Sequence, residues 1–234
     1  MMKKILSCLL IISLFAACSS EKEGNMTVNI SISGLKKGTV YLSKFQDTAI
    51  VNVDSVYLDG KSEFVLKDDV ESPEMYYITL DKLSQEGIAF FGEPGVINVT
   101  SKLEKFTLAS EVTGSKNQEL LEEHRAMANK FNGRQLEFVQ ERFEAQKAGD
   151  EALLEDINKQ EENLIKRKYL FTTNYAVNHS DYEVAPYLAL TELVYATTSI
   201  LDTVNNSLSE KVKASKYGIE LDKYIKRIKE NEGN

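Results

Sequence analysis

The sequence predicts an α+β fold, in which an N-terminal antiparallel β-sandwich or open barrel of about eight strands precedes a C-terminal helical region. Apolar residues alternate with polar ones between Met26 and Val112, which is the two-residue period of half-buried strands. Beyond Ser115 apolar residues recur every three or four positions, as on one face of a helix. No spacer rich in proline, glycine or serine separates the two patterns near Gly114, so we expect them to pack as one unit.

Turn residues divide the all-β region, residues 26–113, into short strands. Asp59-Gly60 is typical of a hairpin turn, and Gly92-Glu93-Pro94-Gly95 separates two further apolar runs. Strands spaced in this way are typical of sandwiches and open barrels. The expected strands are 28–32, 40–42, 50–58, 64–66, 75–80, 88–91, 96–99 and 106–112.

The helical region, residues 114–234, is predicted to hold roughly five helices, the last ending near Lys229. Gly149-Asp150 predicts a turn with Asp150 as the next N-cap, which makes the first two long helices an antiparallel pair. Pro186 favours a later helix that begins near Val184, because proline is tolerated in a first turn. Three pairs have the spacing of a capping box: Ser115 with Gln118, Ser180 with Glu183, and Ser207 with Glu210.

The helical periodicity also predicts which side chains are buried. On the first long helix the apolar face is expected to include Leu120, Leu121, His124, Ala128 and Phe131, followed by Leu136, Val139 and Phe143. We expect the helical region to pack against the strands through four residues: Phe131, Phe143, Phe171 and Leu188.

The N-terminus has the pattern of a bacterial lipoprotein signal. Lys3 and Lys4 precede an apolar stretch that ends in Ala16-Ala17, directly before Cys18. This pattern predicts a signal peptide over residues 1–17, lipid attachment at Cys18, and a tether over residues 18–25. The apolar stretch is too short to span a membrane. A cleaved signal without lipidation stays open, because Phe15 stands where an aliphatic residue is more usual.

Charge and cysteine content exclude several functions. Without residues 1–17 the chain keeps 217 residues, and 26 basic residues stand against 36 acidic ones, a formal charge of −10. This balance argues against a nucleic-acid partner. Cys8 lies in the signal and Cys18 is expected to be acylated, so we predict neither an internal disulfide nor thiol exchange.

Motifs for catalysis or for a cofactor are not found in the sequence. The two histidines, His124 and His179, are interpreted as a packed core residue and a loop residue that contacts backbone. A transition-metal site lacks ligands, and no phosphate loop, nucleophile elbow or dinucleotide fingerprint occurs. We therefore predict a protein that is not an enzyme, with no catalytic residue, no metal and no cofactor.

Two sets of residues are candidates for recognition or modification. Tyr76-Tyr77 on a strand direct one ring to each face, so we expect at least one to be exposed and able to bind a partner; packing against the helices is the competing interpretation. Three Asp-Ser/Thr-apolar tripeptides resemble an O-glycosylation acceptor of Gram-negative envelope proteins. Their hydroxyls belong to Thr48, Ser55 and Thr203.

The chain also resembles a known family. Val53-Asp54-Ser55-Val56, Phe91-Gly92-Glu93-Pro94-Gly95 and Val112-Thr113-Gly114-Ser115 are similar to the domain of unknown function that stands N-terminal to the thioredoxin-like module in lipid-anchored bacterial thiol-disulfide oxidoreductases of the thiol-specific antioxidant class. The segment from Ser215 to Ile228 extends the likeness over nearly the whole mature chain. The resemblance implies an envelope setting, but this chain has no Cys-x-x-Cys and stops about where the thioredoxin-like module begins.

Together these observations predict a lipid-anchored protein of the Gram-negative cell envelope, at the outer membrane, that acts as a non-catalytic binding or accessory module. Its expected partners are the membrane, through the lipid on Cys18, and an envelope protein such as a thioredoxin-like oxidoreductase. Two alternatives stay open. One is a substrate- or partner-facing component of an envelope thiol-disulfide oxidoreductase system, and the other is a surface carbohydrate-handling lipoprotein.

Overall fold

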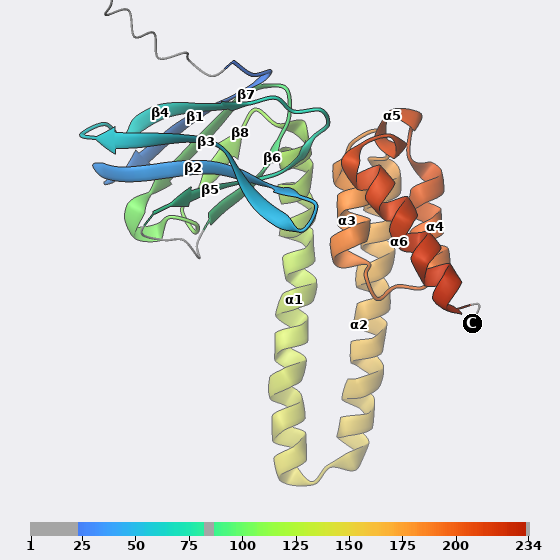
Figure 1. The fold of residues 1–234 in the computed structure, drawn as a ribbon. Coiled ribbons are helices and arrows are strands. Elements are labelled where there is room, and N and C mark those ends of the chain that lie inside the picture. The colour runs from blue at the N-terminus through green and yellow to red at the C-terminus, as the bar shows by residue number, and fades with distance from the viewer. Residues whose placement is uncertain (1–22, 82–86, 233–234) are drawn as a thin grey trace, which may run out of the picture.

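The computed structural model of the protein describes residues 23–81 and 87–232, in which eight strands are followed by six helices (Figure 1). The predicted signal peptide and Cys18 lie outside the described residues. Among the helices of the described part, none has the length and apolar character needed to cross a membrane.

The strands form two four-stranded sheets that do not close into a barrel, which confirms the sandwich and rejects a closed barrel. One sheet has the order β4-β1-β7-β8, and the other has the order β3-β2-β5-β6. The strands are β1 (Met26–Ser33), β2 (Lys37–Gln46), β3 (Ala49–Asp59), β4 (Glu63–Asp68), β5 (Glu74–Leu80), β6 (Gly87–Gly92), β7 (Gly95–Lys102) and β8 (Glu111–Thr113).

Two details of the strand prediction are wrong. β1 and β7 pair in parallel, with Val28 opposite Ile97, whereas the other strand pairs are antiparallel. The strand expected over 106–112 is only Glu111–Thr113, because a 3₁₀ turn, η1 (Leu103–Lys105), and further turns precede it. Phe106 is nevertheless buried in the sandwich core, which explains why its segment has the apolar pattern of a strand.

Strand β5 contacts the two halves of the molecule with its two faces. Tyr76 and Ile78 point into the sandwich core, whereas Met75 and Tyr77 belong to the cluster that meets the helices. The alternation follows from the pleat, which directs successive side chains to opposite faces. The outer face of β5 and β6 therefore packs against the helical region, through a cluster that is distinct from the sandwich core.

The helical region consists of a long hairpin and four shorter helices. Gly149 adopts the left-handed conformation after α1, and the Asp150 carboxylate accepts a hydrogen bond from the Leu153 amide, so the predicted turn and N-cap are confirmed. Figure 1 shows this hairpin projecting well beyond the sandwich and the other helices. The helices are α1 (Lys116–Ala148), α2 (Glu151–Asn178), α3 (Val184–Glu192), α4 (Thr198–Ser207), α5 (Glu210–Lys213) and α6 (Lys216–Glu232).

The two hairpin helices contact each other through a heptad-spaced stripe. Phe138 and Ala145 of α1 form a buried cluster with Ile157 and Leu164 of α2. The predicted apolar face over Leu136, Val139 and Phe143 is wrong, because these three side chains are exposed. At 100° per residue they lie more than a quarter-turn away from Phe138, so α1 carries two apolar stripes, and α2 covers only one of them.

Contacts between the two halves differ from the prediction. Phe131 packs on Phe171 within the hairpin and Phe143 is exposed, so neither joins the helices to the strands as expected. Phe171 packs at the edge of the joining cluster, and Leu188 is buried within it as predicted. The cluster is formed by Met75, Phe91, Leu120, Leu121, Tyr175, Val184, Leu188 and Tyr217.

Only the first of the three predicted capping boxes caps a helix, and it does so with its serine alone. Ser115 Oγ accepts from the Gln118 amide, but the Gln118 side-chain oxygen accepts from the amide of Phe91 rather than returning to the cap. Ser180 and Ser207 do not cap helices. The Glu183 carboxylate makes no cap bond to α3, Ser207 is the last residue of α4, and the cap position of α5 is Ser209.

Gly114 gives a matched test of the connection between the halves. It has φ of +95°, and a Cβ there would lie 2.2 Å from the Val96 carbonyl oxygen. We expect Gly114→Ala to lower the free energy of unfolding by at least about 2 kcal/mol, because the strain and the clash add. Gly133 lies at an exposed and uncrowded position of α1, so Gly133→Ala should raise the free energy of unfolding by about 0.5–1 kcal/mol. Urea unfolding of both variants checks the pair, and equal stabilities would contradict this account.

Candidate functional site

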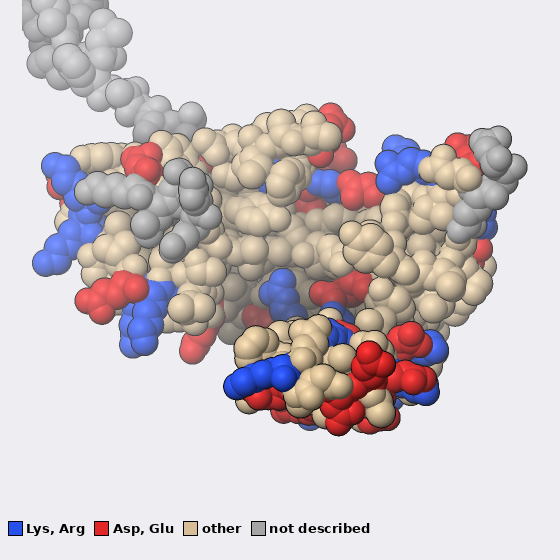
Figure 2. All heavy atoms as spheres, turned by 90° about the horizontal axis from the view of Figure 1, so that it is seen from below, with Lys and Arg blue, Asp and Glu red and all other residues tan. Residues whose placement is uncertain are grey.

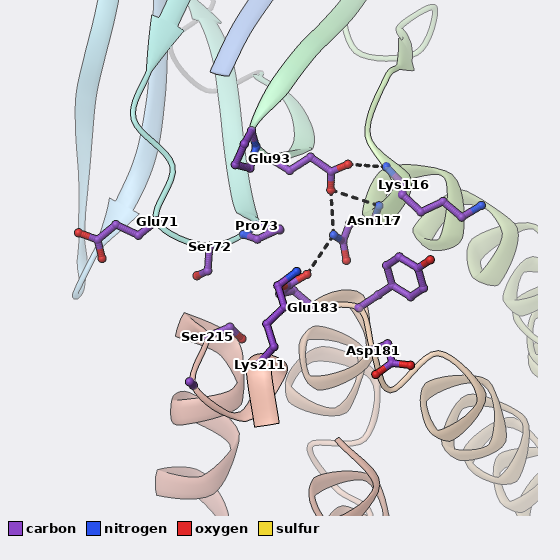
Figure 3. Close-up of a pocket in the computed structure, with 13 residues that line it drawn as sticks. Glu71, Ser72, Pro73, Glu93, Lys116, Asn117, Asp181, Glu183, Lys211 and Ser215 are labelled. Carbon is purple, nitrogen blue, oxygen red and sulfur yellow. Dashed lines mark hydrogen bonds and ion pairs between the residues drawn. The ribbon is translucent and has the colours of Figure 1, made fainter. Parts of the chain in front are cut away.

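A pocket of about 530 Å³ lies where the sandwich meets the helical region (Figure 3). Its walls come from segments that are distant in sequence: the loop after β4, the β6–β7 loop, the start of α1, the segment before α3, and the turn between α5 and α6. The pocket is lined by Glu71, Ser72, Pro73, Glu93, Pro94, Lys116, Asn117, Asp181, Tyr182, Glu183, Lys211, Ala214 and Ser215.

The β6–β7 loop places Glu93 over the start of α1. Gly92 lies so close to Tyr76 that a Cβ would come within 2.4 Å of the ring, which fixes the path of the loop. The Glu93 carboxylate then accepts from the Lys116 backbone amide at 2.6 Å and from Asn117 Nδ2 at 2.8 Å. A carboxylate in this position satisfies an orphan amide and complements the positive end of the helix dipole.

Asn117 connects both halves of the molecule. Its side chain is buried, and Nδ2 donates to Glu93 from the sandwich and to Glu183 Oε2, at 3.2 Å, from the helical region. Its Oδ1 accepts from the Val184 amide at 2.8 Å, so the same side chain caps α3. The donors and acceptors of this one amide therefore fix the α1 and α3 helix starts relative to the β6–β7 loop.

Glu183 retains one unused acceptor. Its side chain is 2% exposed, and Oε1 has no hydrogen-bond partner among the described residues. The Lys211 ammonium stands 3.7 Å from this oxygen, which is close enough for electrostatic attraction but too long for a hydrogen bond. Because the Lys211 side chain is 78% exposed, it has freedom to swing away from the pocket.

The charges that line the pocket are unbalanced. Four carboxylates, from Glu71, Glu93, Asp181 and Glu183, face two ammonium groups, from Lys116 and Lys211. Lys116 is also paired with Glu119 on the outer surface of α1. The described residues contain no group of three His, Cys, Asp or Glu side chains arranged to hold a metal ion. The lining therefore favours a positively charged organic group over an anion.

The pocket serines bond to nearby backbone. Ser215 Oγ donates to the Val212 carbonyl at 2.6 Å, and Ser72 Oγ accepts from the Lys216 amide. The first bond fixes the turn between α5 and α6, and the second holds the start of α6 against the loop after β4. No histidine lines the pocket to act as a base for either hydroxyl.

A second polar cluster lies beside the pocket, around Tyr76. The Tyr76 hydroxyl donates to Asp68 at 2.8 Å and accepts from Lys44 at 3.0 Å, while Glu74 pairs with Lys44 and Lys216. Burial, supported by Asp68, raises the pKa of the Tyr76 hydroxyl, so it remains a donor. Desolvation would lower the pKa of Lys44, but its bonds to Tyr76 and Asp68 raise it overall, so Lys44 stays protonated and pairs with the acidic side chains of this cluster.

The predicted recognition and modification residues do not converge on the pocket. Tyr76 is fully buried, which is incompatible with partner binding through its ring, and Tyr77 is half-buried against Phe45. Thr48, Ser55 and Thr203 are exposed on separate elements, and the Thr203 hydroxyl donates to the Ser199 carbonyl. Their glycosylation stays a prediction.

Both histidines have the predicted structural roles. His179 ends α2, and its Nδ1 contacts the Tyr175 carbonyl at 2.8 Å. His124 is buried, stacks on Phe171 and contacts Thr172 Oγ1 at 3.0 Å. Neither lies in the pocket.

Comparison with known protein families finds a similarity in the N-terminal part of the chain. Residues 26–121 match the family model of a domain of unknown function, DUF4369. The match covers the sandwich and the first turn of α1, so Glu93 and Asn117 lie within the matched residues, whereas Glu183 and Lys211 lie beyond them. Searches of curated proteins and of solved structures found no match to this chain.

Sequence reasoning missed the residues that build the pocket. Asn117 looks like an ordinary polar residue in a first helical turn, and Glu183 fits a capping box that does not form. One local signal was available: Glu93 lies between Gly92 and Pro94 in a conspicuous turn motif. Nothing local indicates that its carboxylate reaches α1, 23 residues later.

His124 gives a pH test of the helical packing. Burial lowers the pKa of the imidazole in the folded protein, so the unfolded chain takes up a proton first as the pH falls through about 6.5. We expect wild-type protein to lose stability between pH 7.5 and 5.5 relative to His124→Gln, which cannot titrate and can still contact Thr172. Denaturant midpoints at both pH values measure the difference, and parallel pH profiles for the two proteins would contradict it.

Proposed function

We propose that the protein is a lipid-anchored, non-catalytic binding module of the bacterial cell envelope and that the junction pocket is its ligand site. The observation that carries the proposal is that Oε1 of Glu183 is buried and has no hydrogen-bond partner among the described residues. A buried carboxylate oxygen without a donor is costly, so such groups are rare unless a ligand or water completes them.

The chemistry of the pocket favours a ligand with a primary ammonium or guanidinium group. Either group donates hydrogen bonds and carries the charge that offsets the acidic excess of the lining. Lys211 already occupies the neighbourhood of Glu183 with a mobile ammonium, and a ligand amine would replace it at closer range. The remaining acidic side chains, Glu71 and Asp181, would attract the ligand from solvent.

Several polar groups of the pocket already form structural hydrogen bonds, which supports binding rather than catalysis. Glu93 and Asn117 are engaged in capping α1 and α3, and Ser215 is engaged in the start of α6. General acid–base or nucleophilic chemistry needs a pair of groups within reach of each other and of the substrate. The buried acceptor of this site, Glu183 Oε1, makes no hydrogen bond to another described residue, which suits recognition of a donor.

Attachment at the N-terminus fits the shape of the molecule. Asn25 hydrogen-bonds Asp69 and Val70, so the chain is already fixed to the sandwich at the start of β1. Figure 1 shows the chain entering the sandwich at the end opposite the tip of the α1–α2 hairpin. A lipid on Cys18 would therefore hold the sandwich near the membrane and direct the hairpin away from it.

The ligand proposal is tested with n-butylammonium as probe and n-butanol as its uncharged counterpart. In NMR titrations, butylammonium should shift the amides of Asn117 and Val184, and butanol should not. Glu183→Gln keeps the shape and one acceptor but removes the charge, so we expect it to lose the response. Lys211→Ala removes the competing ammonium and should tighten binding about three- to fivefold, at the upper end of the range of an exposed ion pair.

Lys213→Ala is the matched control, because it removes the same charge from the same short helix, where Lys213 pairs with Glu210 outside the pocket. It should leave binding within twofold of wild type. Equal effects of Lys211→Ala and Lys213→Ala, or equal responses to butylammonium and butanol, would contradict the proposal.

The anchor proposal predicts that the mature protein begins with an acylated Cys18. Mass spectrometry of the N-terminal peptide should find this modification, and Cys18→Ala should leave unlipidated precursor, because no other cysteine follows the signal. Cys8→Ala, inside the predicted signal, is the control that should still be acylated. A free thiol on Cys18, or cleavage at another residue, would overturn lipid anchoring.

A further inference from the structure

The outer face of α1 carries an exposed apolar stripe that nothing in the described fold covers. Leu136, Val139 and Phe143 are 72%, 55% and 63% exposed. They follow one another at intervals of three and four residues, which places them on one side of the helix. Asn129 and Asn132 extend the same stripe toward the sandwich, and Gln146 extends it toward the tip. We refer to these six residues as the α1 seam.

The seam differs in kind from isolated surface hydrophobic residues, which are common. The hairpin already has its own core on the other side of α1, where Phe138 and Ala145 meet α2. Figure 2, seen from the hairpin tip, shows the hairpin standing in front of the sandwich and the other helices, so its far end is open on several sides. A second, regularly spaced stripe on such a helix is typical of a helix–helix contact.

We propose that the α1 seam pairs two copies of this chain as a parallel, in-register coiled coil. The seam has the heptad pattern, with Asn129, Leu136 and Phe143 at the first core position and Asn132, Val139 and Gln146 at the second. This pairing is independent of the ligand pocket, and its failure would leave the proposed function untouched.

The absence of charge along the seam favours a second copy of this chain as the partner that covers it. No residue of the seam is ionised, and the flanking positions nearest its centre, Gly133, Gln135 and Gln140, are uncharged as well. Arg142, the next flanking residue, is paired with Glu161 of its own chain. A partner helix must therefore present a neutral, apolar stripe of the same spacing, and the seam itself meets that requirement without like-charge repulsion.

The polar positions favour the parallel arrangement. In register, Leu136, Val139 and Phe143 each meet their own counterpart, and Asn129 meets Asn129 of the second copy. A buried asparagine pair at this core position is the best-attested way in which coiled coils fix register and a two-stranded state. Parallel pairing also places both sandwiches at the same end, which suits two chains tethered to one membrane; only this last point rests on the proposed anchor.

The pairing is tested by introducing single cysteines and measuring disulfide cross-links. The protein used begins at Ser19, so it contains every described residue and no native cysteine. Val139→Cys lies at the centre of the seam, Asn129→Cys lies at its upper part, and Glu144→Cys lies on α1 outside the seam. Under mild oxidation we expect disulfide-linked dimers from Val139→Cys and Asn129→Cys but not from Glu144→Cys, because core counterparts stand within disulfide reach.

An antiparallel pair centred on Val139 would separate the two Asn129 positions by about 30 Å along the helix. Linkage of Val139→Cys alone would therefore overturn the parallel register, and equal linkage in all three variants, or none, would overturn the interface.

Sedimentation equilibrium provides the second measurement. Leu136→Glu should weaken self-association at least about tenfold, whereas Leu108→Glu, at a leucine of the sandwich that is also exposed, should not. Equal association of both variants would reject the seam.

Discussion

The first turn of α1 is the constraint on which the rest of the structure depends. Ser115 caps the helix, Gln118 binds the Phe91 amide at the edge strand β6, and Asn117 bridges Glu93 and Glu183. All three side chains are almost completely buried, so their bonds form in a poorly hydrated setting where an unsatisfied partner would be costly. One helical turn therefore fixes the position of the sandwich, the start of α3 and the direction of the hairpin.

The pocket is a consequence of this arrangement. Two halves with separate cores meet through an apolar cluster on the β5–β6 face and through polar bonds at the β6–β7 loop, and the space left between these contacts is the pocket. Glu183 satisfies the second Asn117 donor with one oxygen, which leaves the other buried at the pocket wall without a hydrogen bond from a described residue. The same residue that holds the halves together thus supplies the free acceptor.

Local sequence rules predicted the elements well and their long-range partners poorly. Alternation located the strands and Asp150 located the α2 cap, because both depend on neighbouring residues. The parallel pairing of β1 with β7 joins residues about seventy positions apart, and no turn signals it. On α1 the periodicity was detected, but it could not distinguish the stripe that packs on α2, through Phe138, from the exposed stripe at Leu136. Of the site residues, only the Glu93 turn was visible, since Asn117 and Glu183 acquire their roles from tertiary contacts alone.

α1 links the pocket to the seam, because Asn117 lies in its first turn and Val139 lies about six turns further along. Because α1 is one continuous helix, its two ends keep a constant distance and orientation. Pairing through the seam would therefore fix the spacing and orientation of two pockets without contacting either of them. Ligand affinity at one pocket would then be unchanged by dimerisation. Avidity for a ligand that carries two amines would instead depend on whether its span matches the separation that α1 sets. Under these two proposals, binding strength would depend on the first turn of α1 and reach on the seam near its other end.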